Sequence, residues 1–343
     1  MLPPSNIEAE EQLDNALSEP TPQVVETMSR LDGDIVVLGI AGKMGPSLAR
    51  MARRASEVAG VQRKIFGVAR FSSGGREELE AHSVTTIPCD LLNEKEVARL
   101  PDVPNVIFMA GRKFGSSADQ AATWAINSYL PGLVCHRYRG SRIVAFSTGN
   151  VYALTPVESG GALETDAPDP VGEYAMSCLG RERVFEHFSR SFGIPLALIR
   201  LNYACDLRYG VLVDLAQKIA AGETIDLSMG YFNTIWQGDA NAMTLAAFDH
   251  VAVPPFVVNV TGPEILSVRS VSERLGRTMN KPVRFTGTEP ATALLSNARR
   301  GLELLDPPRV SADQLIEWVG YWVLRGGRTL DKPTHFEARD GRF

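Results

Sequence analysis

Cysteine and histidine are scarce in this chain, and their spacing excludes several kinds of site. The four cysteines stand far apart, at positions 89, 135, 178 and 205, and form no CxxC pair. This argues against a structural zinc site or a disulfide framework, and it fits reduced thiols in a cytoplasmic protein. The five histidines show no metal-ligand spacing. We therefore expect no bound metal ion.

Long apolar runs and basic blocks are also missing. No run approaches the roughly 18 apolar residues of a membrane-spanning helix, and the acidic N-terminus lacks the layout of a signal peptide. The formal net charge is -5 at pH 7, so neither nucleic acid nor a membrane is an expected partner. The chain has 343 residues, 44% of them hydrophobic. It is long enough for a large core, and a small-molecule substrate is the expected partner.

The distribution of apolar segments predicts an α/β fold. Short apolar runs with the length of buried strands alternate with longer segments of helical pattern. Strands are expected at 35–38, 64–69, 84–87, 105–109, 142–146, 196–200 and 256–260, with the main helices at 47–55, 117–138, 173–191 and 211–221. This alternation predicts a doubly wound, parallel, Rossmann-type sheet with a smaller C-terminal substrate lobe over the carboxyl ends of its strands.

The expected division of the chain follows this pattern. Residues 1–32 read as a helical appendage, and residues 331–343 as a polar tail that either folds over a neighbouring surface or is disordered. The dinucleotide-binding domain is assigned to residues 33–202 and 232–262. The substrate lobe is assigned to residues 203–231 and 263–330.

The first predicted strand leads into a glycine-rich turn, which is the most informative stretch of the chain. Gly39, Gly42 and Gly45 follow the strand and precede a helix, with Lys43 and Met44 inside the same loop. Glycines at this spacing let the backbone turn sharply and approach a pyrophosphate, which the free N–H groups of the helix N-terminus can hold. This context favours dinucleotide binding over a tight turn without a ligand.

Charges near the second strand favour NADP over NAD. A carboxylate at the end of this strand would bind the adenine ribose of NAD. This chain has Arg70 there instead, and Lys43 lies in the glycine loop. Two cations and no carboxylate suit a 2′-phosphate, although both can equally be ordinary surface charges.

Further cofactor positions follow the ends of later strands. Asp90, with Leu91 after it, is placed either to meet the adenine amino group or to cap a helix. Ala110 and Gly111 follow the fourth strand and are small enough to leave room for a cofactor. Leu201, at the end of the sixth strand, completes the predicted set.

Two hydroxyl-bearing residues stand where chemistry is expected. The fifth strand runs into Ser147-Thr148-Gly-Asn-Val-Tyr152, and Tyr174 begins the next helix. Thr148 can donate and accept hydrogen bonds, and Tyr174 is a phenol that can exchange a proton with a substrate alcohol. A lone tyrosine near a helix start is usually a packing residue, but its order after the glycine loop and the Ser-Thr segment favours a catalytic role.

Together these motifs resemble the extended short-chain dehydrogenase/reductase family, which contains nucleotide-sugar epimerases and dehydratases. The resemblance covers roughly residues 33–325 and includes Trp236-Gln-Gly-Asp239 and Asn259-Val-Thr-Gly262. It implies that Tyr174 is the catalytic tyrosine and that Thr148 occupies the catalytic hydroxyl position. It also implies a homodimer that pairs through the tyrosine helix and the helix before it. Substrate contacts are expected from Asn150, Asn202 and Arg208, although Arg208 can equally be a loop charge.

The chain departs from the family at one catalytic position. The family pattern Tyr-x-x-x-Lys reads Tyr174-Ala-Met-Ser-Cys178 here. In the family the lysine lowers the tyrosine pKa and holds the nicotinamide ribose, and a neutral thiol cannot supply that charge. Another cation can substitute: Lys113 and Arg112, after the fourth strand, are better candidates than Arg181, which is too far along the helix for direct contact. Alternatively, the positive nicotinamide ring suffices for a slow enzyme, or the protein binds the cofactor without turnover.

These observations lead to one expected function and one alternative. The expected protein is an NAD(P)-dependent oxidoreductase, epimerase or dehydratase that transfers hydride at a secondary alcohol or ketone of a sugar-like substrate. Tyr174 is its acid/base. The alternative is a catalytically degenerate NADP(H)-binding sensor or scaffold, which the cysteine at position 178 motivates.

Overall fold

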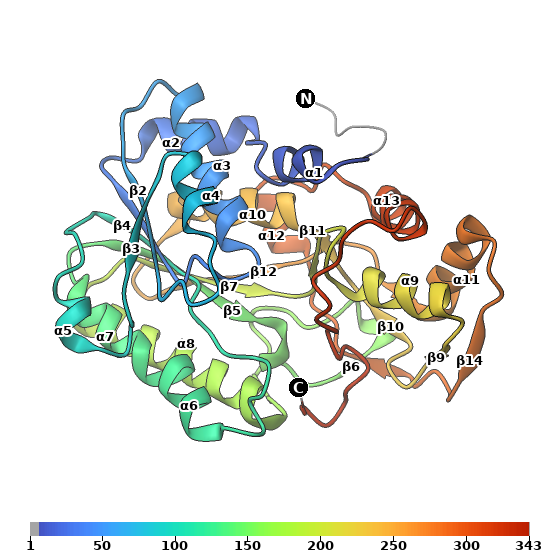
Figure 1. Cartoon of the computed structure of the whole chain (residues 1–343). Helices are drawn as coiled ribbons and strands as arrows, with labels where there is room; N and C mark the ends of the chain where they lie inside the picture. Colours follow the sequence, from blue (N-terminus) through green and yellow to red (C-terminus); the bar gives the residue numbers. More distant parts are fainter. Residues whose placement is uncertain (1–6, 343) are drawn as a thin grey trace.

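A seven-stranded parallel sheet forms the centre of the computed structural model, which describes residues 7–342 (Figure 1). Its strand order is β12-β7-β5-β4-β1-β2-β3. The strands are β1 (Ile35–Leu38), β2 (Ile65–Ala69), β3 (Val84–Pro88), β4 (Asn105–Phe108), β5 (Arg142–Thr148), β7 (Leu196–Leu201) and β12 (Phe256–Val260). Each segment expected to be a strand is one, so the predicted α/β, Rossmann-type sheet is confirmed. β5 runs two residues further than expected, through Ser147 and Thr148.

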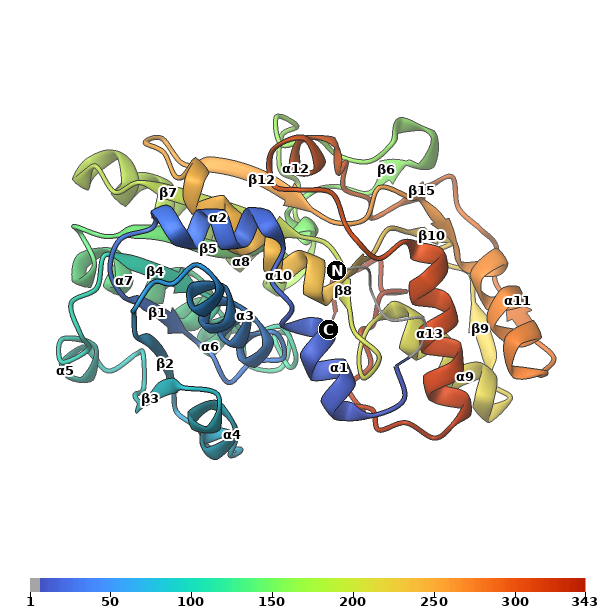
Figure 2. The same ribbon diagram turned by 90° about the horizontal axis from the view of Figure 1, so that it is seen from above.

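The strands are apolar throughout because helices cover both faces of the sheet. All four residues of β1 are buried. One face is covered by α2 (Pro22–Arg30), α3 (Gly45–Val58) and α10 (Gln237–Ala246), and the other by α7 (Leu130–Arg137) and α8 (Gly172–Phe192) (Figures 1 and 2). Shorter helices at the sheet are α4 (Arg76–Ala81), α5 (Glu94–Val97), α6 (Gln120–Trp124) and α12 (Arg299–Leu304).

The helix expected at 117–138 is interrupted. A π-helix, Ala125–Tyr129, separates α6 from α7. Pro131 has no N–H to donate to the carbonyl of Asn127 four residues earlier. The guanidinium of Arg181 on α8 donates to that carbonyl at 3.3 Å instead. The interruption therefore couples this helix to the tyrosine helix.

A second lobe lies beside the carboxyl ends of the strands. Its core is formed by α9 (Val211–Ala221), α11 (Val268–Met279) and α13 (Ala312–Leu324), which pack against one another (Figure 2). Four two-stranded pairs complete it: β6 (Thr155–Pro156) with β15 (Thr292–Ala293), β8 (Ala204–Cys205) with β11 (Ile235–Trp236), β9 (Thr224–Asp226) with β14 (Arg284–Thr286), and β10 (Tyr231–Phe232) with β13 (Leu266–Ser267).

Both ends of the chain are built into the fold. The N-terminal segment, expected to be an appendage, buries Leu13 and Leu17 of α1 (Glu10–Leu17) in the core of the second lobe, and Val24 and Met28 of α2 in the core of the sheet domain. Residues 1–6 of the expected appendage and residue 343 of the tail lie outside the described residues. The described part of the tail folds over its neighbours, because it runs between the two lobes and buries Phe336 (Figure 1).

Candidate active site

The glycine loop has the geometry that a pyrophosphate site needs. Gly39 has a φ of +88°, and a Cβ there would lie 2.6 Å from the amide nitrogen of Ala110. A Cβ on Gly45 would lie 2.0 Å from the carbonyl oxygen of Ile40. No side chain caps α3, which begins at Gly45. Its first N–H groups can therefore donate hydrogen bonds to a phosphate oxygen, and the positive end of its dipole favours the negative charge.

The structure corrects the role expected for Lys43. Its ammonium donates to the carbonyl of Ala204 at 2.8 Å and lies 4.1 Å from the ring centroid of Tyr209. Both partners belong to the segment that enters the second lobe, so Lys43 does not extend toward the ribose position at the end of β2. Of the two cations expected to meet a 2′-phosphate, only Arg70 remains there, and it is exposed.

Asp90 lies at the carboxyl end of β3 but caps no helix. Its carboxylate accepts the amide N–H of Leu92 at 3.1 Å, and the side chain of Asn93 is the cap of α5. The helix-cap alternative for Asp90 is therefore wrong, while its expected contact with the adenine stays a prediction. Leu91 is buried next to it.

The loop after β4 is held in place by one asparagine. The side chain of Asn127 accepts the N–H of Arg112 at 2.9 Å and donates to its carbonyl at 3.0 Å. The guanidinium of Arg181 donates to the same asparagine oxygen at 2.7 Å and to the carbonyl of Phe146 at 2.9 Å. A Cβ on Gly111 would lie 2.9 Å from that guanidinium. This clamp fixes the segment that carries Ala110, Gly111 and the two candidate cations.

Thr148, Tyr174 and Cys178 form one hydrogen-bonded group. Thr148 is the last residue of β5, and Tyr174 lies in the first turn of α8. The phenol is hydrogen-bonded to the side chains of Thr148 and Cys178. Burial raises the pKa of Tyr174 well above its usual value, and Cys178 adds to the rise, while the charge of Arg181 and the bond to Thr148 oppose it. Burial also raises the pKa of the Cys178 thiol, so that this residue is neutral.

Lys113 is the candidate cation that lies beside Tyr174. Its ammonium is 6.0 Å from the ring centroid of Tyr174 and donates to the carbonyl of Thr334 at 3.0 Å. Burial, together with the charge of Lys43, lowers the pKa of Lys113 to about 8. The Arg112 guanidinium lies 3.6 Å from the Asp119 carboxylate instead. Arg181, expected to be too distant, donates hydrogen bonds to Asn127 and Phe146 but still lowers the pKa of Tyr174 through its charge.

The structure places the residues expected to contact the substrate in different surroundings. Asn150 accepts the hydroxyl of Thr148 at 2.9 Å and so lies within the catalytic group. Asn202, next to Leu201 at the end of β7, is buried and donates to Asn233 at 2.7 Å. Both can still face a ligand, and their substrate roles stay predictions.

Arg208 lies among carboxylates, an arrangement that the sequence did not indicate. Its guanidinium lies 2.9 Å from Asp14 of α1, 3.4 Å from Asp206 and 3.9 Å from Glu10. These contacts bind the N-terminal helix to the second lobe. The interpretation of Arg208 as a loop charge was closer to the structure than its expected role toward a substrate anion.

A buried polar network behind β5 was also missed. Glu182 of α8 accepts from Ser147 at 2.6 Å and from two nitrogens of Arg200, at 3.0 and 2.7 Å. Arg200 donates in turn to the hydroxyl of Tyr152, which donates to Asn259. The network holds α8 against β5 and β7, and so it fixes the spacing between Thr148 and Tyr174. Two of its members, Tyr152 and Asn259, stood in motifs read from the sequence, but nothing there indicated the network.

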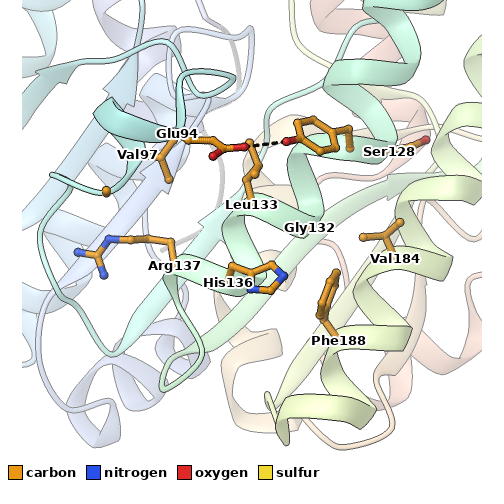
Figure 3. Close-up of a pocket in the computed structure, with 11 residues that line it drawn as sticks. Glu94, Val97, Ser128, Gly132, Leu133, His136, Arg137, Val184 and Phe188 are labelled. Atoms are coloured by element: carbon orange, nitrogen blue, oxygen red, sulfur yellow. Dashed lines mark hydrogen bonds between the residues drawn. The ribbon is translucent and has the colours of Figure 1, made fainter.

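A separate pocket lies on the outer face of α7 and α8 (Figure 3). It measures about 730 Å³ and is lined by Tyr129, Gly132, His136, Val184 and Phe188, among others. The hydroxyl of Tyr129 donates to Glu94 at its rim. This is the face on which the expected homodimer would pair, and the dimer stays a prediction.

Within residues 7–342, no cluster of His, Cys, Asp and Glu side chains has the geometry of a metal site. No helix in that range combines the length and the apolar character needed to cross a membrane.

The parallel sheet, with the glycine loop and the Thr148–Tyr174 pair after its strands, defines a Rossmann-type protein. The sequence model of the NAD dependent epimerase/dehydratase family matches residues 35–225, which is more than half of the chain. The chain belongs to this family, and the resemblance read from its motifs is confirmed. A comparison with curated proteins finds no match.

Solved structures share the fold of this chain. UDP-glucose 4-epimerase from Thermotoga maritima is 18% identical, with a TM-score of 0.70 over 85% of this chain and 99% of that one. UDP-glucuronic acid 4-epimerase from Bacillus cereus, solved with NAD, is 19% identical, with a TM-score of 0.72 over 85% and 99%. dTDP-glucose 4,6-dehydratase from Bacillus anthracis, also solved with NAD, is 16% identical, with a TM-score of 0.70 over 86% and 97%. At this identity the likeness is one of fold.

Proposed function

We propose that this protein binds a nicotinamide dinucleotide and acts on a secondary alcohol or ketone of a sugar-like substrate, as an epimerase, dehydratase or oxidoreductase. The bound nicotinamide would supply the acceptor and donor of hydride. Tyr174 takes the proton of the reacting hydroxyl and returns it, while Thr148 orients and polarises that oxygen. The observation that carries the proposal is the hydrogen-bonded Thr148–Tyr174 pair, which joins the end of β5 to the first turn of α8.

Lys113 supplies the positive charge that the family obtains from its motif lysine. A cation near a phenol favours the phenolate and so lowers the cost of proton transfer. Lys113 lies over the ring of Tyr174, whereas Arg112 is directed to Asp119. Arg181, on the same helix as Tyr174, also lowers the pKa of the phenol through its charge.

NAD is the favoured cofactor in this proposal, although the charges in the sequence pointed to NADP. The family is described as NAD dependent, and two of the neighbours were solved with NAD. Lys43 is directed to the second lobe, which removes half of the argument for a 2′-phosphate. Arg70 is the feature that still favours NADP, and calorimetric titration with NAD⁺ and NADP⁺ decides between them.

A second candidate function is cofactor binding without turnover. It is motivated by Cys178, because a neutral thiol supplies no positive charge to offset the effect of burial, which raises the pKa of Tyr174. In that case the protein acts as a nicotinamide-nucleotide sensor or scaffold, and the glycine loop is retained for binding alone.

The decisive test is the variant Tyr174→Phe, assayed with NAD⁺ against UDP-glucose, UDP-glucuronic acid and dTDP-glucose. Epimers and keto sugars are separated by chromatography, and cofactor affinity is measured by calorimetry. We expect turnover to fall by about 10²–10⁴-fold, the usual worth of a positioned acid/base, with NAD⁺ affinity within threefold of wild type. Tyr321→Phe, on α13, is the matched control.

Unchanged turnover in Tyr174→Phe would rule out the assigned role. A wild-type protein that binds NAD⁺ but converts none of these sugar nucleotides would favour the second candidate. A protein that binds neither NAD⁺ nor NADP⁺ would overturn both.

A further inference from the structure

The C-terminal segment, residues 331–342, crosses from the second lobe to the sheet domain, and we call it the strap (Figure 1). It follows α13 and is drawn in red between the two lobes. Residues 331–342 form neither a helix nor a strand. The position of the strap is therefore set by its contacts with the two lobes, and these contacts differ in kind.

On the second lobe the strap is anchored by buried and charged side chains. The N–H and the hydroxyl of Thr334 donate to Asp214 of α9, at 2.8 and 2.6 Å. Phe336 is 2% exposed, and its ring centroid lies 6.1 Å from that of Phe232. Further polar contacts join the same parts: Lys218 with Glu337 at 3.1 Å, and Arg339 with the carbonyl and hydroxyl of Thr292 at 2.9 and 2.7 Å. The strap is thus part of the second lobe.

On the sheet domain the strap holds the cation that lies beside Tyr174. The carbonyl of Thr334 accepts from the ammonium of Lys113 at 3.0 Å, and this ammonium lies 6.0 Å from the ring centroid of Tyr174. Because Asp214 fixes Thr334 on the second lobe, the hydrogen bond ties Lys113 to that lobe. The ammonium is then oriented by the strap and not by a reacting oxygen.

The far end of the strap packs on the start of the tyrosine helix. A Cβ on Gly341 would lie 2.1 Å from the carbonyl oxygen of Val171, and a Cβ on Gly172 would lie 2.4 Å from the carbonyl oxygen of Gly341. Gly172 and Gly341 have φ values of +84° and +70°, a region that glycine adopts without strain. This close contact of two main chains therefore requires a glycine on each side.

The contacts of the strap lie on both sides of Tyr174. The loop that carries Lys113 flanks the phenol on one side, and Val171 and Gly172 precede it on the other. Since the strap joins both flanks to the second lobe, it lies across the side from which a substrate bound to that lobe would approach.

We propose that the strap is an autoinhibitory gate, which releases the sheet domain before a substrate reaches Tyr174. The proposal rests on the proposed function, because it takes the cleft beside Tyr174 to be the substrate site. Release breaks the bond from Lys113 to Thr334 and the main-chain contact of Gly341, and it leaves the anchors on the second lobe in place. No helix or strand has to unfold for this movement.

The test compares two glycine substitutions in the full chain. Gly341→Ala adds a methyl group that would meet main-chain atoms of Val171. Gly326→Ala is the matched control, because Gly326 has a φ of +71° against +70° for Gly341, and nothing lies within 4 Å of its added Cβ. Both variants carry the same backbone cost. The difference between them therefore reports the docking of the strap.

Acetylation of Lys113 measures docking without any turnover. The ligand-free protein is treated with a limiting amount of an N-hydroxysuccinimide ester of acetic acid, and modified lysines are identified by mass spectrometry. Exposed Lys95 is the internal standard. We expect acetylation of Lys113 relative to Lys95 to be at least fivefold higher in Gly341→Ala than in wild type and in Gly326→Ala.

Thr334→Val releases the strap independently of the glycine contact. It removes the hydroxyl that donates to Asp214 at 2.6 Å and accepts the N–H of Phe336 at 3.3 Å, while the shape of the side chain is kept. We expect the same rise in acetylation of Lys113. With NAD⁺ and the sugar nucleotide that wild type converts, kcat/KM should rise at least threefold in both release variants, because a larger fraction of the protein is open to substrate.

Two results would overturn the proposal. One is equal acetylation of Lys113 in wild type and in both release variants. The other is a lower kcat/KM in Gly341→Ala at an unchanged midpoint of thermal unfolding, which would make the docked strap part of the productive site. If wild type and the release variants convert no sugar nucleotide, the proposed function fails, whereas the acetylation comparison still decides whether the strap covers Lys113.

Discussion

The side chains of Tyr174 and Cys178 are hydrogen-bonded to each other, one turn apart on the same face of α8. The resemblance to the family implies a lysine at the second of these positions, and this chain has a neutral thiol there. The thiol is fully buried, and Arg181 one turn further contributes charge from a distance. The positive charges near Tyr174 therefore come from its surroundings: Arg181 lowers its pKa, and the Lys113 ammonium lies 6.0 Å from its ring centroid.

This relationship predicts that restoring the family lysine lowers activity. Cys178→Lys would bury a third cation near Arg181 and Lys113, with no new carboxylate partner. We expect kcat/KM to fall at least tenfold and the free energy of unfolding to fall by about 3 kcal/mol, the scale of an uncompensated buried charge. Activity is measured with the sugar nucleotides named above, and stability by urea unfolding.

Cys178→Ser is the control, because it keeps a small neutral donor next to Tyr174. It should retain most of the activity. A large gain of activity in Cys178→Lys over an inactive wild type would contradict this prediction and favour a degenerate site.

The titration of Lys113 predicts an alkaline limit to activity. Its pKa is lowered to about 8, first by burial and then by Lys43, so the ammonium is charged below pH 8 and neutral above it. If its charge assists Tyr174, kcat should decline as the pH rises through about 8. The measurement is a pH profile of kcat between pH 6 and 10, after confirming that the fold persists over this range.

Two substitutions at Lys113 check this assignment. Lys113→Arg keeps the charge, since an arginine stays protonated up to about pH 12, and should move the decline to higher pH. Lys113→Met should reduce kcat by about tenfold or more at pH 7 and abolish the decline near pH 8. An unaltered profile in Lys113→Met would exclude Lys113 as the substitute cation.

The glycine loop offers a pair of substitutions that separate folding from cofactor binding. Gly45→Ala would place a Cβ 2.0 Å from the carbonyl oxygen of Ile40, a main-chain atom that cannot move aside cheaply. Gly42→Ala would meet only the carbonyl oxygen of Gly39, at 3.5 Å. We expect Gly45→Ala to lower the midpoint of thermal unfolding strongly, and Gly42→Ala to fold normally.

Gly42→Ala should instead change the affinity for NAD⁺ while leaving the fold intact. In Gly42→Ala the added methyl group occupies the surface on which a pyrophosphate would lie, so NAD⁺ binding should weaken at least tenfold in a folded protein. Both effects are measured by differential scanning fluorimetry with and without NAD⁺. Equal NAD⁺ affinity in wild type and Gly42→Ala would argue against this loop as the pyrophosphate site.

The sheet and the positions of Thr148 and Tyr174 could be predicted because their causes are local in the sequence. Apolar runs such as Ile35–Leu38 specify buried strands by composition alone, and parallel strands with helical connections admit few topologies. Glycine spacing after a strand restricts the turn in the same local way. The meeting of Thr148 with Tyr174 followed from a family pattern rather than from the residues themselves.

The directions of long side chains could not be predicted, because they depend on distant packing. Lys43 turns toward Ala204, which is 161 positions away in the chain. Asn127 lies in a helical segment with no motif of its own, yet it clamps the backbone of Arg112 through two hydrogen bonds. Its role depends on the helix interruption near Pro131, and nothing in the local pattern indicated where the freed carbonyl would find a donor.

Arg208 gives the sharpest case for a test, because the sequence allowed a substrate role and the structure supplies a structural one. Its side chain is 16% exposed and contacts Asp14 and Asp206, the second of which is almost fully buried. Arg208→Met would leave Asp206 without its guanidinium partner and release α1. We expect a loss of about 2–3 kcal/mol in the free energy of unfolding, with KM for the sugar nucleotide within twofold of wild type.

Arg70→Met, at an exposed arginine on the sheet domain, should leave stability unchanged. A KM that rises tenfold in Arg208→Met at unchanged stability would reverse this assignment, because only direct contact with the substrate separates the two quantities in that direction.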